Sequence, residues 1–523
     1  MPSFFSMTLL APLALLAGSA FCFAGPGRRP VRAMAALQFL ALAALAAALA
    51  AVLHFVLSGA QSAPLPGAGA LHMLVRLDML SVTMLLLVTF IGWVVIRYAA
   101  TYLDGEARQG AFMGWLAVTL AAVMLLVQAG DLATFAAAWI ATGVGLHKLL
   151  LFYGDRAQAR RAARKKFIVA RMGDASLLAA VLVLGIGFGT TDIAAIAAAA
   201  AGGEMPAGTV AAAGLLALAA LLKSAQFPMH GWLTEVMEAP TPVSALLHAG
   251  VINAGGFLLI RFADVMLLAP GVLAALVMVG GFTALLGGLA MLAQPAVKTS
   301  LAWSTIAQMG FMIMQCGLAL FPLALLHIVA HSLYKAHAFL ASGGAVEQVA
   351  SIRRPGPVAV PGAGAVLRAF ALALAVYAAI GLAFGLVFGL DGKSPQALAL
   401  GAILIFGVAY LIAQGLADAA PRALTRRTLL SALAATISYF ALHSGAEWLA
   451  AGTLPATPAP GPLEWALLAL ALLSFGLVAV AQASFPLWSA HPAAAGLRVH
   501  LANGLYANAL FDRLTGNWSV TRP

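Results

Sequence analysis

Long apolar segments recur along almost the whole chain, and this repetition constrains the fold more than any other feature. A helix needs roughly 20 apolar residues to cross a bilayer, and the sequence offers about fifteen such segments. Hydrophobic residues make up 63% of the chain and charged residues 9%, whereas a soluble domain carries about 25% charged residues. A soluble core cannot absorb this much apolar surface. The chain is therefore predicted to be an all-α polytopic membrane protein with about 14–15 transmembrane helices.

The predicted spans run from the first residues to the last hundred without a soluble-looking block between them. Their approximate cores are residues 7–24, 34–57, 79–96, 112–130, 132–153, 168–190, 209–229, 241–260, 265–292, 300–318, 322–345, 369–390, 399–416, 428–446 and 463–485. The first segment is interpreted as a retained helix rather than a signal peptide, because its basic cluster (Arg28, Arg29, Arg32) follows the apolar run instead of preceding it.

Basic residues set the predicted orientation, because Lys and Arg concentrate in cytoplasmic loops. With the N-terminus placed outside, 22 of the 28 Lys and Arg residues fall in inner loops or in the C-terminal tail. The outer loops keep only Arg76, Arg261 and Lys393, and the remaining three lysines fall within spans: Lys148, Lys223 and Lys335. We therefore expect the C-terminus in the cytoplasm. The basic run 156–166 is interpreted as a solvated inner loop that fixes this topology.

Several classes of function lack their motifs. Cys22 and Cys316 are the only cysteines, too few for a disulfide framework or a CxxC metal site. We find no Walker A, GxGxxG, HExxH or GxSxG pattern in a suitable context. No cofactor or metal is expected in this chain, and the net charge of +11 is explained by topology rather than by nucleic-acid binding.

Ionisable side chains inside the predicted spans are the strongest functional signal, since such groups are costly in a bilayer and line ion pathways. His327, His331 and Lys335 are spaced i, i+4, i+8 and so lie on one helix face. This stripe predicts a hydrogen-bonded proton relay. The alternative is a polar stripe that packs helices together.

Lys223 lies near Pro228, which interrupts helical hydrogen bonding. Broken helices expose backbone groups at ion sites in transporters, and His230 adds a polar side chain nearby. The alternative is a lysine that extends to the membrane surface. His248, in the next span, is expected on the same path, although a lone histidine also serves simple packing. Asn253, one turn further on, could hold a water molecule.

Lys148 is a weaker candidate for the path, because it lies five residues from the end of its span. Carboxylates are scarce within the spans. Asp174 is expected to pair with Arg171. Glu235 and Glu238, in the following inner loop, either gate proton entry near Lys223 or are solvated loop charges.

The segment around Lys223, KSAQFPMHGWLTEVMEAPTPVSALLHAG, resembles the signature of the antiporter-like subunits of respiratory complex I and of Mrp-type sodium/proton antiporters. Residues 76–103, 131–153, 165–178 and 297–312 continue the resemblance, which covers about residues 72–350. It implies antiporter-like inverted repeats with discontinuous helices, and a proton path through Lys223, His248, His331 and Lys335.

Two departures from this family pattern stand out. The family has a glutamate directly after the tryptophan of its fifth helix, whereas Trp139 is followed here by Ile140. A distal lysine motif is also missing, since residues 366–390 hold no lysine. We divide the chain into N-terminal transmembrane helices (1–70), a proton-conducting antiporter-like core (71–350), C-terminal transmembrane helices (351–485) and a cytoplasmic amphipathic tail (486–523).

The forms HGWL and HAGVINAGGFLLIR and the ending LRVHLANGLYANALFDRLTGNW resemble the DabB subgroup, the membrane subunits of two-component inorganic carbon uptake systems in bacterial inner membranes. The resemblance implies a cation flux, of protons or sodium ions, that energises a zinc carbonic-anhydrase-like DabA partner, which would hold the zinc. The amphipathic tail is the expected docking segment, through Tyr506, Phe511, Arg513 and Trp518. A helix lying on the membrane surface is the alternative.

The leading functional prediction is thus a transporter subunit for carbon dioxide or bicarbonate uptake, with any catalysis in the partner. The second is a proton-translocating subunit of a complex I-like, hydrogenase-linked or Mrp-type antiporter complex. A purely structural membrane anchor is disfavoured by the lysine and histidine residues within the spans.

Overall fold

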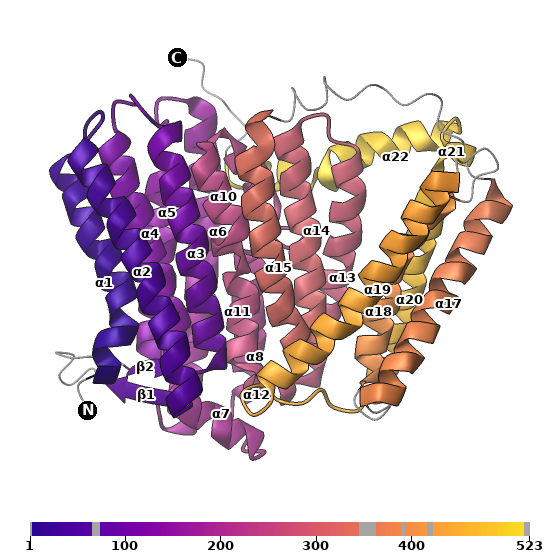
Figure 1. The fold of residues 1–523 in the computed structure, drawn as a ribbon, viewed down its shortest axis with the longest axis horizontal. Coiled ribbons are helices and arrows are strands. Elements are labelled where there is room, and N and C mark those ends of the chain that lie inside the picture. Colours follow the sequence, from indigo (N-terminus) through magenta and orange to yellow (C-terminus); the bar gives the residue numbers. More distant parts are fainter. Residues whose placement is uncertain (1–2, 65–73, 345–361, 389–392, 416–421, 517–523) are drawn as a thin grey trace.

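The computed structural model describes residues 3–64, 74–344, 362–388, 393–415 and 422–516. Most of these residues form long helices that run side by side across the molecule (Figure 1). The first part of the chain supplies α1 (Ser3–Ala24), α2 (Val31–Ser58), α3 (Met79–Tyr102), α4 (Gln109–Gln128), α5 (Leu132–Leu150), α6 (Ala157–Phe188), α7 (Ile193–Ala201) and α8 (Thr209–Lys223).

The central part of the chain contains the shorter and interrupted helices. It supplies α9 (Gly231–Glu235), η2 (Val236–Glu238), α10 (Thr241–Ala249), η3 (Val251–Asn253), α11 (Ala254–Arg261), α12 (Ala263–Leu267), α13 (Pro270–Leu292), α14 (Val297–Gly317), α15 (Phe321–Leu340) and η4 (Ala341–Gly344). The last part supplies α17 (Ala363–Phe388), α18 (Pro395–Gly415), α19 (Arg422–Ala450), α20 (Pro462–Ala483), α21 (Phe485–Trp488), α22 (Pro492–Ala502), η6 (Gly504–Tyr506) and α23 (Ala507–Leu514).

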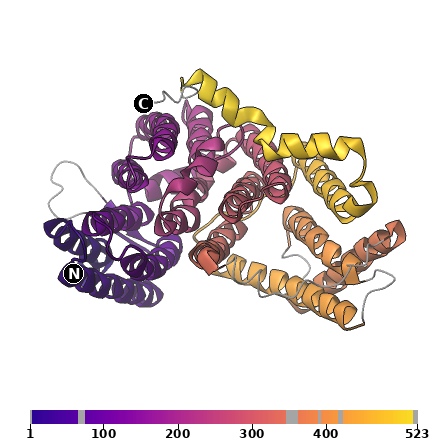
Figure 2. The same cartoon turned by 90° about the horizontal axis from the view of Figure 1, so that it is seen from above.

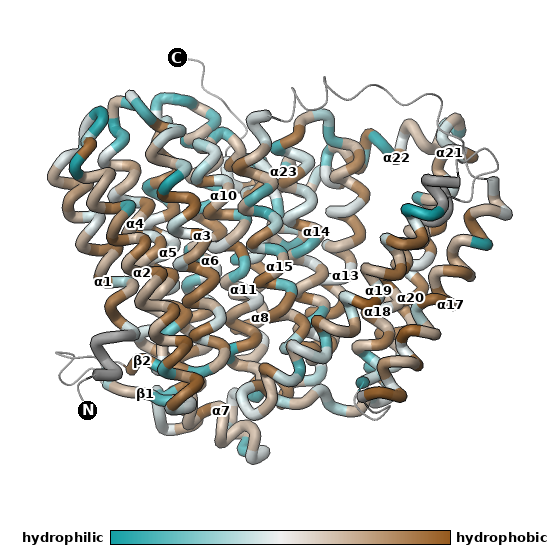
Figure 3. The backbone as a smooth tube through the Cα atoms, viewed as in Figure 1, coloured by the Kyte–Doolittle hydropathy of each residue, from teal (hydrophilic) through white to brown (hydrophobic). Residues whose placement is uncertain are grey.

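The predicted spans are confirmed as helices. Among the described residues, eleven helical segments are long and apolar enough to cross a membrane, and three shorter apolar helices lie in α1, α8 and α18. The remaining predicted span, residues 300–318, coincides with α14. Figure 3 shows hydrophobic residues along the middle of the helices, while paler and hydrophilic stretches interrupt them around α11, α14 and α15.

Two of the spans are discontinuous, as the family resemblance implied. Helix α8 stops at Lys223, and a non-helical stretch precedes α9, which begins at Gly231. The next span bends at Gly250, where α10 gives way to η3 and then α11. These breaks place backbone groups and polar side chains within the bundle, because a regular helix would have used its backbone groups internally.

A small hairpin closes one end of the bundle, next to α7 (Figure 1). Strands β1 (Gln61–Pro64) and β2 (Leu74–Leu77) are antiparallel, with Gln61 opposite Leu77. Helix α3 begins directly after β2, and Asp78 caps it by accepting a hydrogen bond from the Ser81 amide at 2.8 Å. These strands are an addition to the predicted all-α fold, and the turn between them lies outside the described residues.

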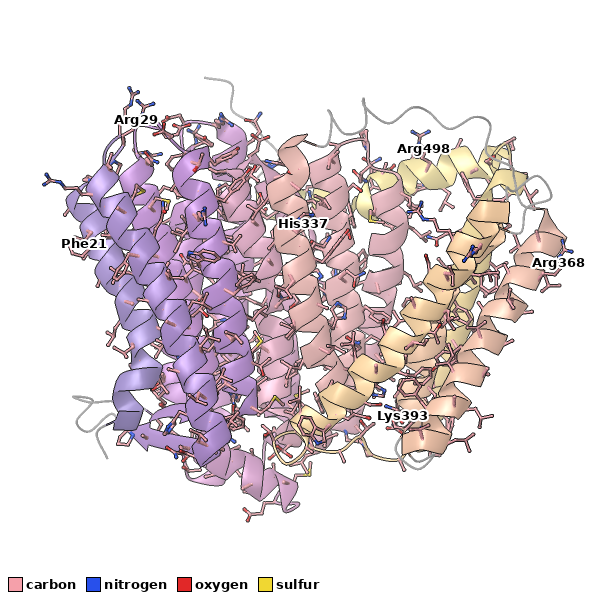
Figure 4. The ribbon with its side chains drawn as sticks, viewed as in Figure 1. Phe21, Arg29, His337, Arg368, Lys393 and Arg498 are labelled. Carbon is pink, nitrogen blue, oxygen red and sulfur yellow. The ribbon has the colours of Figure 1, made fainter. Side chains whose placement is uncertain are left out.

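The opposite end of the bundle is called the basic face here, because it carries Arg29 and Arg498 (Figure 4). Helices α22 and α23 lie along it, at the edge of the bundle when seen from above (Figures 1 and 2). Lys393 lies at the other end (Figure 4). This separation agrees with the predicted alternation of loops.

The prediction of a solvated loop at residues 156–166 is wrong. From Ala157 this segment is the start of α6, a helix of 32 residues that is longer than a bilayer span requires. Lys165 and Lys166 are buried. Local charge density suggested solvent exposure, but the C-terminal segment of the chain covers one side of this helix and α5 covers another.

Helices α13 and α14 pack with their backbones in close contact, through small residues that suit membrane helix pairs. A Cβ atom on Gly310 would lie 2.7 Å from the Gly280 carbonyl oxygen. We therefore expect Gly310→Ala to destabilise the protein by about 1–3 kcal/mol, the usual cost of overpacking.

The matched control for this prediction is Gly288→Ala in α13, because nothing lies within 4 Å of a Cβ added there. Alanine in open space within a helix should be neutral or stabilising, by up to about 1 kcal/mol. Thermal unfolding of the detergent-solubilised variants measures both effects. Equal stability of Gly310→Ala and the wild type would contradict the close packing.

Candidate functional site

Lys223, the last residue of α8, lies against the face of Trp139 in α5. Its Nζ atom is 4.2 Å from the centroid of the indole ring, a cation–π distance. The edge of the same indole is held by Asp174, since Trp139 Nε1 donates a hydrogen bond to Asp174 Oδ1 at 3.0 Å. Within the described residues no hydrogen bond or ion pair engages the ammonium group of Lys223, so the Trp139 ring is its direct contact.

The predicted pairing of Asp174 with Arg171 is confirmed by a distance of 2.5 Å from Arg171 Nη2 to Asp174 Oδ2. The break after Lys223 is held by Ser224, whose Oγ donates to the carbonyl of Ile252 at 2.9 Å. This bond ties the end of α8 to η3, the bend of the next span. The two discontinuities therefore support each other.

His248 occupies the centre of the bundle on α10 and is fully buried. Its Nδ1 atom is 3.0 Å from Thr305 Oγ1 of α14, and its ring stacks on Phe339 of α15. The backbone carbonyl of His248 accepts a hydrogen bond from His331 Nε2 at 3.2 Å. The structure thus brings His248 and His331 together from spans that are distant in sequence.

The three predicted residues on α15 do lie on one helix face. The rings of His327 and His331 have centroids 5.9 Å apart. One turn further, Lys335 Nζ donates to Ser304 Oγ at 2.8 Å and to the Leu301 carbonyl at 3.2 Å. Lys335 is fully buried, and no carboxylate among the described residues pairs with it. The function of this stripe as a relay remains a prediction.

An internal cavity lies beside this group, between α3, α4 and α5 on one side and α10, η3 and α11 on the other. Its walls are mostly apolar, with polar groups from Thr142, Asn253 and Ser332. Asn253 donates to Ser332 Oγ at 2.8 Å, while its side-chain oxygen has no hydrogen-bond partner in the described part of the chain. The place predicted for a water molecule at Asn253 is thus a small cavity with a free acceptor.

Three other predicted site residues have different surroundings. Lys148 is exposed, 5.8 Å from the Trp115 ring, and the structure does not bring it to Lys223. Glu238 is about half exposed, 3.8 Å from Arg156. His230 is buried between Phe227 and Trp303.

A buried ionic cluster on the basic face was not anticipated from the sequence. Lys165 Nζ lies 2.5 Å from Glu235 Oε1 and 2.5 Å from Asp512 Oδ1, and Asp512 also pairs with Arg161. Asn508 completes the cluster by accepting from Lys165 at 2.7 Å and donating to Glu235 at 2.7 Å. Glu235 is therefore an ion-paired side chain rather than a simple solvated charge, and its role as a gate stays a prediction.

The predicted docking tail is partly used within the chain itself. Phe511 packs against the main core, near Lys165. Tyr506 and Arg513 are exposed, and Trp518 lies outside the described residues. The spacing of Asn508 and Asp512, one turn apart in the tail, was the available signal for this contact. This signal could be interpreted only once the tail was known to fold back onto α6 and α9.

Removal of the Asp512 carboxylate should destabilise the protein strongly, because Lys165 is fully buried and would lose one of its two acids. We expect Asp512→Ala to cost about 3–5 kcal/mol, as for other broken buried ion pairs. Asp104→Ala is the control, since the Arg29–Asp104 pair is exposed and should contribute about 0–1 kcal/mol. Thermal unfolding measures both, and similar small effects would refute a structural role for the cluster.

Comparison with known proteins agrees with this architecture. Residues 129–356 match the family described as NADH:quinone oxidoreductase/Mrp antiporter, transmembrane region. Residues 66–113 match the family described as the N-terminus of chain 5 of NADH-ubiquinone oxidoreductase, complex I. The fold and the buried lysines and histidines thus define a membrane subunit of the antiporter-like class.

More specific relatives are inorganic carbon transporter subunits. The chain is 39% identical to the probable inorganic carbon transporter subunit DabB2 of Halothiobacillus neapolitanus, over 91% of this chain and 87% of that protein. It is 47% identical to the probable subunit DabB of Hydrogenovibrio crunogenus, over 52% of this chain and 53% of that protein. The chain therefore belongs to the DabB family of probable inorganic carbon transporter subunits.

Solved structures share the fold at lower identity. The chain is similar to a chain of the Mrp complex from Dietzia sp. DQ12-45-1b, with a TM-score of 0.58 and 23% identity, over 99% of this chain and 60% of that chain. A chain of an archaeal membrane-bound sulfane sulfur reductase gives a TM-score of 0.56 at 19% identity, over 92% and 77% of the two chains. At these identities the likeness concerns the fold alone.

Proposed function

We propose that this chain conducts cations, with protons as the first candidate, and so energises inorganic carbon uptake by a zinc carbonic-anhydrase-like partner of the DabA type. The observation that carries the proposal is the set of cationic and imidazole side chains, partly or fully buried, that crosses the bundle from Lys223 to Lys335. Neither of these two lysines pairs with a carboxylate among the described residues. Such groups are expensive inside a membrane and mark ion pathways.

The central step of the proposed path passes through the histidines. His248 and His331 belong to neighbouring spans, and one hydrogen bond of 3.2 Å joins His331 to the backbone of His248. A neutral imidazole accepts a proton at one nitrogen and releases one from the other. His248 Nε2 has no hydrogen-bond partner among the described residues, which leaves it available to bind a proton or water. His327 extends the path along α15, where its Nδ1 atom is 2.8 Å from Gln315 Oε1.

The terminal groups of the path are the two lysines, which load and release a proton more readily than arginine does. Lys335 donates hydrogen bonds to a hydroxyl and a carbonyl, and these acceptors serve the charged ammonium and tolerate the neutral amine. Lys223 is held by the Trp139 ring. Neither environment locks the lysine in its charged form as a direct carboxylate contact would.

The proposed setting is a bacterial inner membrane, with the basic face toward the cytoplasm. The support is the excess of Lys and Arg in the loops at that end, where Arg29 and Arg498 lie (Figure 4). In this orientation α22 and α23 face the cytoplasm. Tyr506 and Arg513, which remain exposed on this segment, are the described candidates for contact with the partner. The zinc and the hydration chemistry are assigned to that partner.

A second candidate function is a subunit of a cation/proton antiporter or redox complex. The fold shared with the Mrp complex chain favours it, because the same bundle serves that assembly. The neighbouring genes discriminate between the two. A gene for a large zinc protein of the DabA type agrees with carbon uptake, whereas further Mrp or quinone-module subunits agree with the alternative.

The proposal predicts that this chain and its genomic neighbour together restore growth in air to a carbonic-anhydrase-deficient bacterium. Lys223→Ala and Lys335→Ala should each abolish the rescue, because each removes a proton-binding group from the path. Growth of the complemented strains is the measurement, with membrane protein levels quantified in parallel. Lys298→Ala is the control and should retain rescue, since Lys298 lies in the first turn of α14 and is not part of the proposed path.

The possible outcomes separate function from mechanism. Absence of rescue by a well-expressed wild-type pair would contradict carbon uptake and favour the antiporter or redox complex. Rescue by both alanine variants would leave carbon uptake in place but exclude the proposed path.

A further inference from the structure

Lys166 is a buried lysine that the proposed path does not use. It lies on α6, and its Nζ donates a hydrogen bond to the carbonyl of Gly143 in α5 at 2.8 Å. Its exposed fraction is 6%. Gly143 lies seven residues before the end of α5 at Leu150, or about 10 Å along the helix. The ammonium group of Lys166 therefore lies inside the bundle rather than at the basic face.

The neighbouring residue, Lys165, is a buried lysine with a structural role in this protein. Lys165 contacts two carboxylates, Glu235 and Asp512, so its charge is neutralised. Lys166 points to a different side of α6 and contacts a backbone carbonyl, with no acid paired to it among the described residues. A buried ammonium without an anion is unfavourable, and this indicates a group that changes its protonation state.

Lys166 and Lys223 lie against the same helix, one turn apart. Gly143, which accepts from Lys166, follows Trp139 by four residues, and Trp139 carries Lys223 on its ring face. One turn corresponds to about 6 Å along α5. Helix α6 also packs against α8 beside Lys223, because Gly173 lies next to Leu222, the residue before Lys223.

The charged groups around Lys166 do not compensate this pair of lysines. Lys223 of α8, and Arg171 and Asp174 of α6, all act electrostatically on Lys166, and His147 of α5 lies close by. Asp174 is the one carboxylate in this set, and it already pairs with Arg171 at 2.5 Å. Two protonated lysines would therefore place an uncompensated excess of positive charge inside the bundle.

The size of the repulsion follows from Coulomb's law. Two unit charges about 6–8 Å apart, at an effective dielectric constant of about 20, change each other's proton affinity by about 30- to 100-fold. The pair therefore binds its first proton much more tightly than its second, as in other coupled pairs of ionisable groups. Over a range of pH, one lysine is protonated and the other is neutral.

We propose that Lys166 and Lys223 form a two-lysine unit that shares one proton, in which Lys166 receives the proton from the side of the basic face and passes it to Lys223. The unit rests on the proposed function, since it describes entry to the same path. In the transfer an N–H bond of the Lys166 ammonium breaks and one forms at the Lys223 amine, directly or through a water molecule. No other bond changes.

The unit accounts for the departure at Ile140. The family resemblance places an acid there, next to Trp139, as the partner of the path lysine. A carboxylate would act on the charge of Lys223 by attraction. Lys166, whose hydrogen-bond acceptor lies one turn along the same helix, acts on it by repulsion. Both devices couple the proton on Lys223 to the state of a neighbouring group.

The test uses the full chain purified with its partner, reconstituted in liposomes that contain a pH-sensitive dye. Lys166→Arg keeps a charge and a donor for the Gly143 carbonyl but does not release its proton. Lys166→Gln keeps a donor and removes the charge. We expect Lys166→Arg to reduce proton flux at least about 10-fold. The residual flux of Lys166→Gln should show its pH midpoint about one to two units higher, because Lys223 loses a repelling neighbour.

Arg164→Gln is the matched control, since Arg164 lies two residues earlier on α6 and is exposed. It should leave both the flux and the pH midpoint unchanged. Wild-type flux in Lys166→Arg, or an unmoved midpoint in Lys166→Gln, would overturn the two-lysine unit. If the Lys166→Gln protein is folded but carries no proton flux, while Arg164→Gln conducts normally, the result agrees with the two-lysine unit. Absence of flux in the wild-type complex would instead contradict the proposed function itself.

Discussion

The energetic cost of an ammonium group inside an apolar bundle is the constraint on which the rest of this structure depends. The chain resolves it in two ways. Lys165 is neutralised by Glu235 and Asp512, and this pairing holds the C-terminal segment in place. Lys166, Lys223 and Lys335 contact carbonyl, hydroxyl or aromatic groups, and no carboxylate of the described residues pairs with them. These partners stabilise a charge without holding it permanently, which suits groups that exchange protons.

The discontinuities of the helices supply the polar surroundings that these lysines need. A regular helix in a bilayer pairs its own backbone N–H and C=O groups, so none of them is available to bind an ion. The stop after Lys223 and the bend at Gly250 release such groups, and the bond from Ser224 to Ile252 holds the two breaks together. His248 follows in the same bent span. The breaks, the histidines and the lysines are thus parts of one arrangement.

The C-terminal segment connects this arrangement to the surface proposed to meet the partner. Asn508 and Asp512 of α23 bind Lys165 and Glu235, and Glu235 ends α9, the helix that follows the break after Lys223. Gly504 adopts a positive φ and lies against Trp303 and His230. A partner that binds α22 and α23 would therefore act on residues within a few positions of the path, through side chains that are already in contact.

The sequence by itself determined the membrane class, the places of the long apolar helices and the candidate lysines and histidines, because hydropathy, charge and helical spacing are local properties of the chain. His327, His331 and Lys335 share a face for the same reason. The tertiary structure alone decided which charges are buried and what they contact. The basic run 156–166 is predicted to be solvated from its sequence, but residues more than 300 positions later in the chain cover part of it. The role inferred for Lys166 depends on its contact with Gly143 and its position near Lys223. Such contacts arise from helix packing, which sequence spacing does not encode.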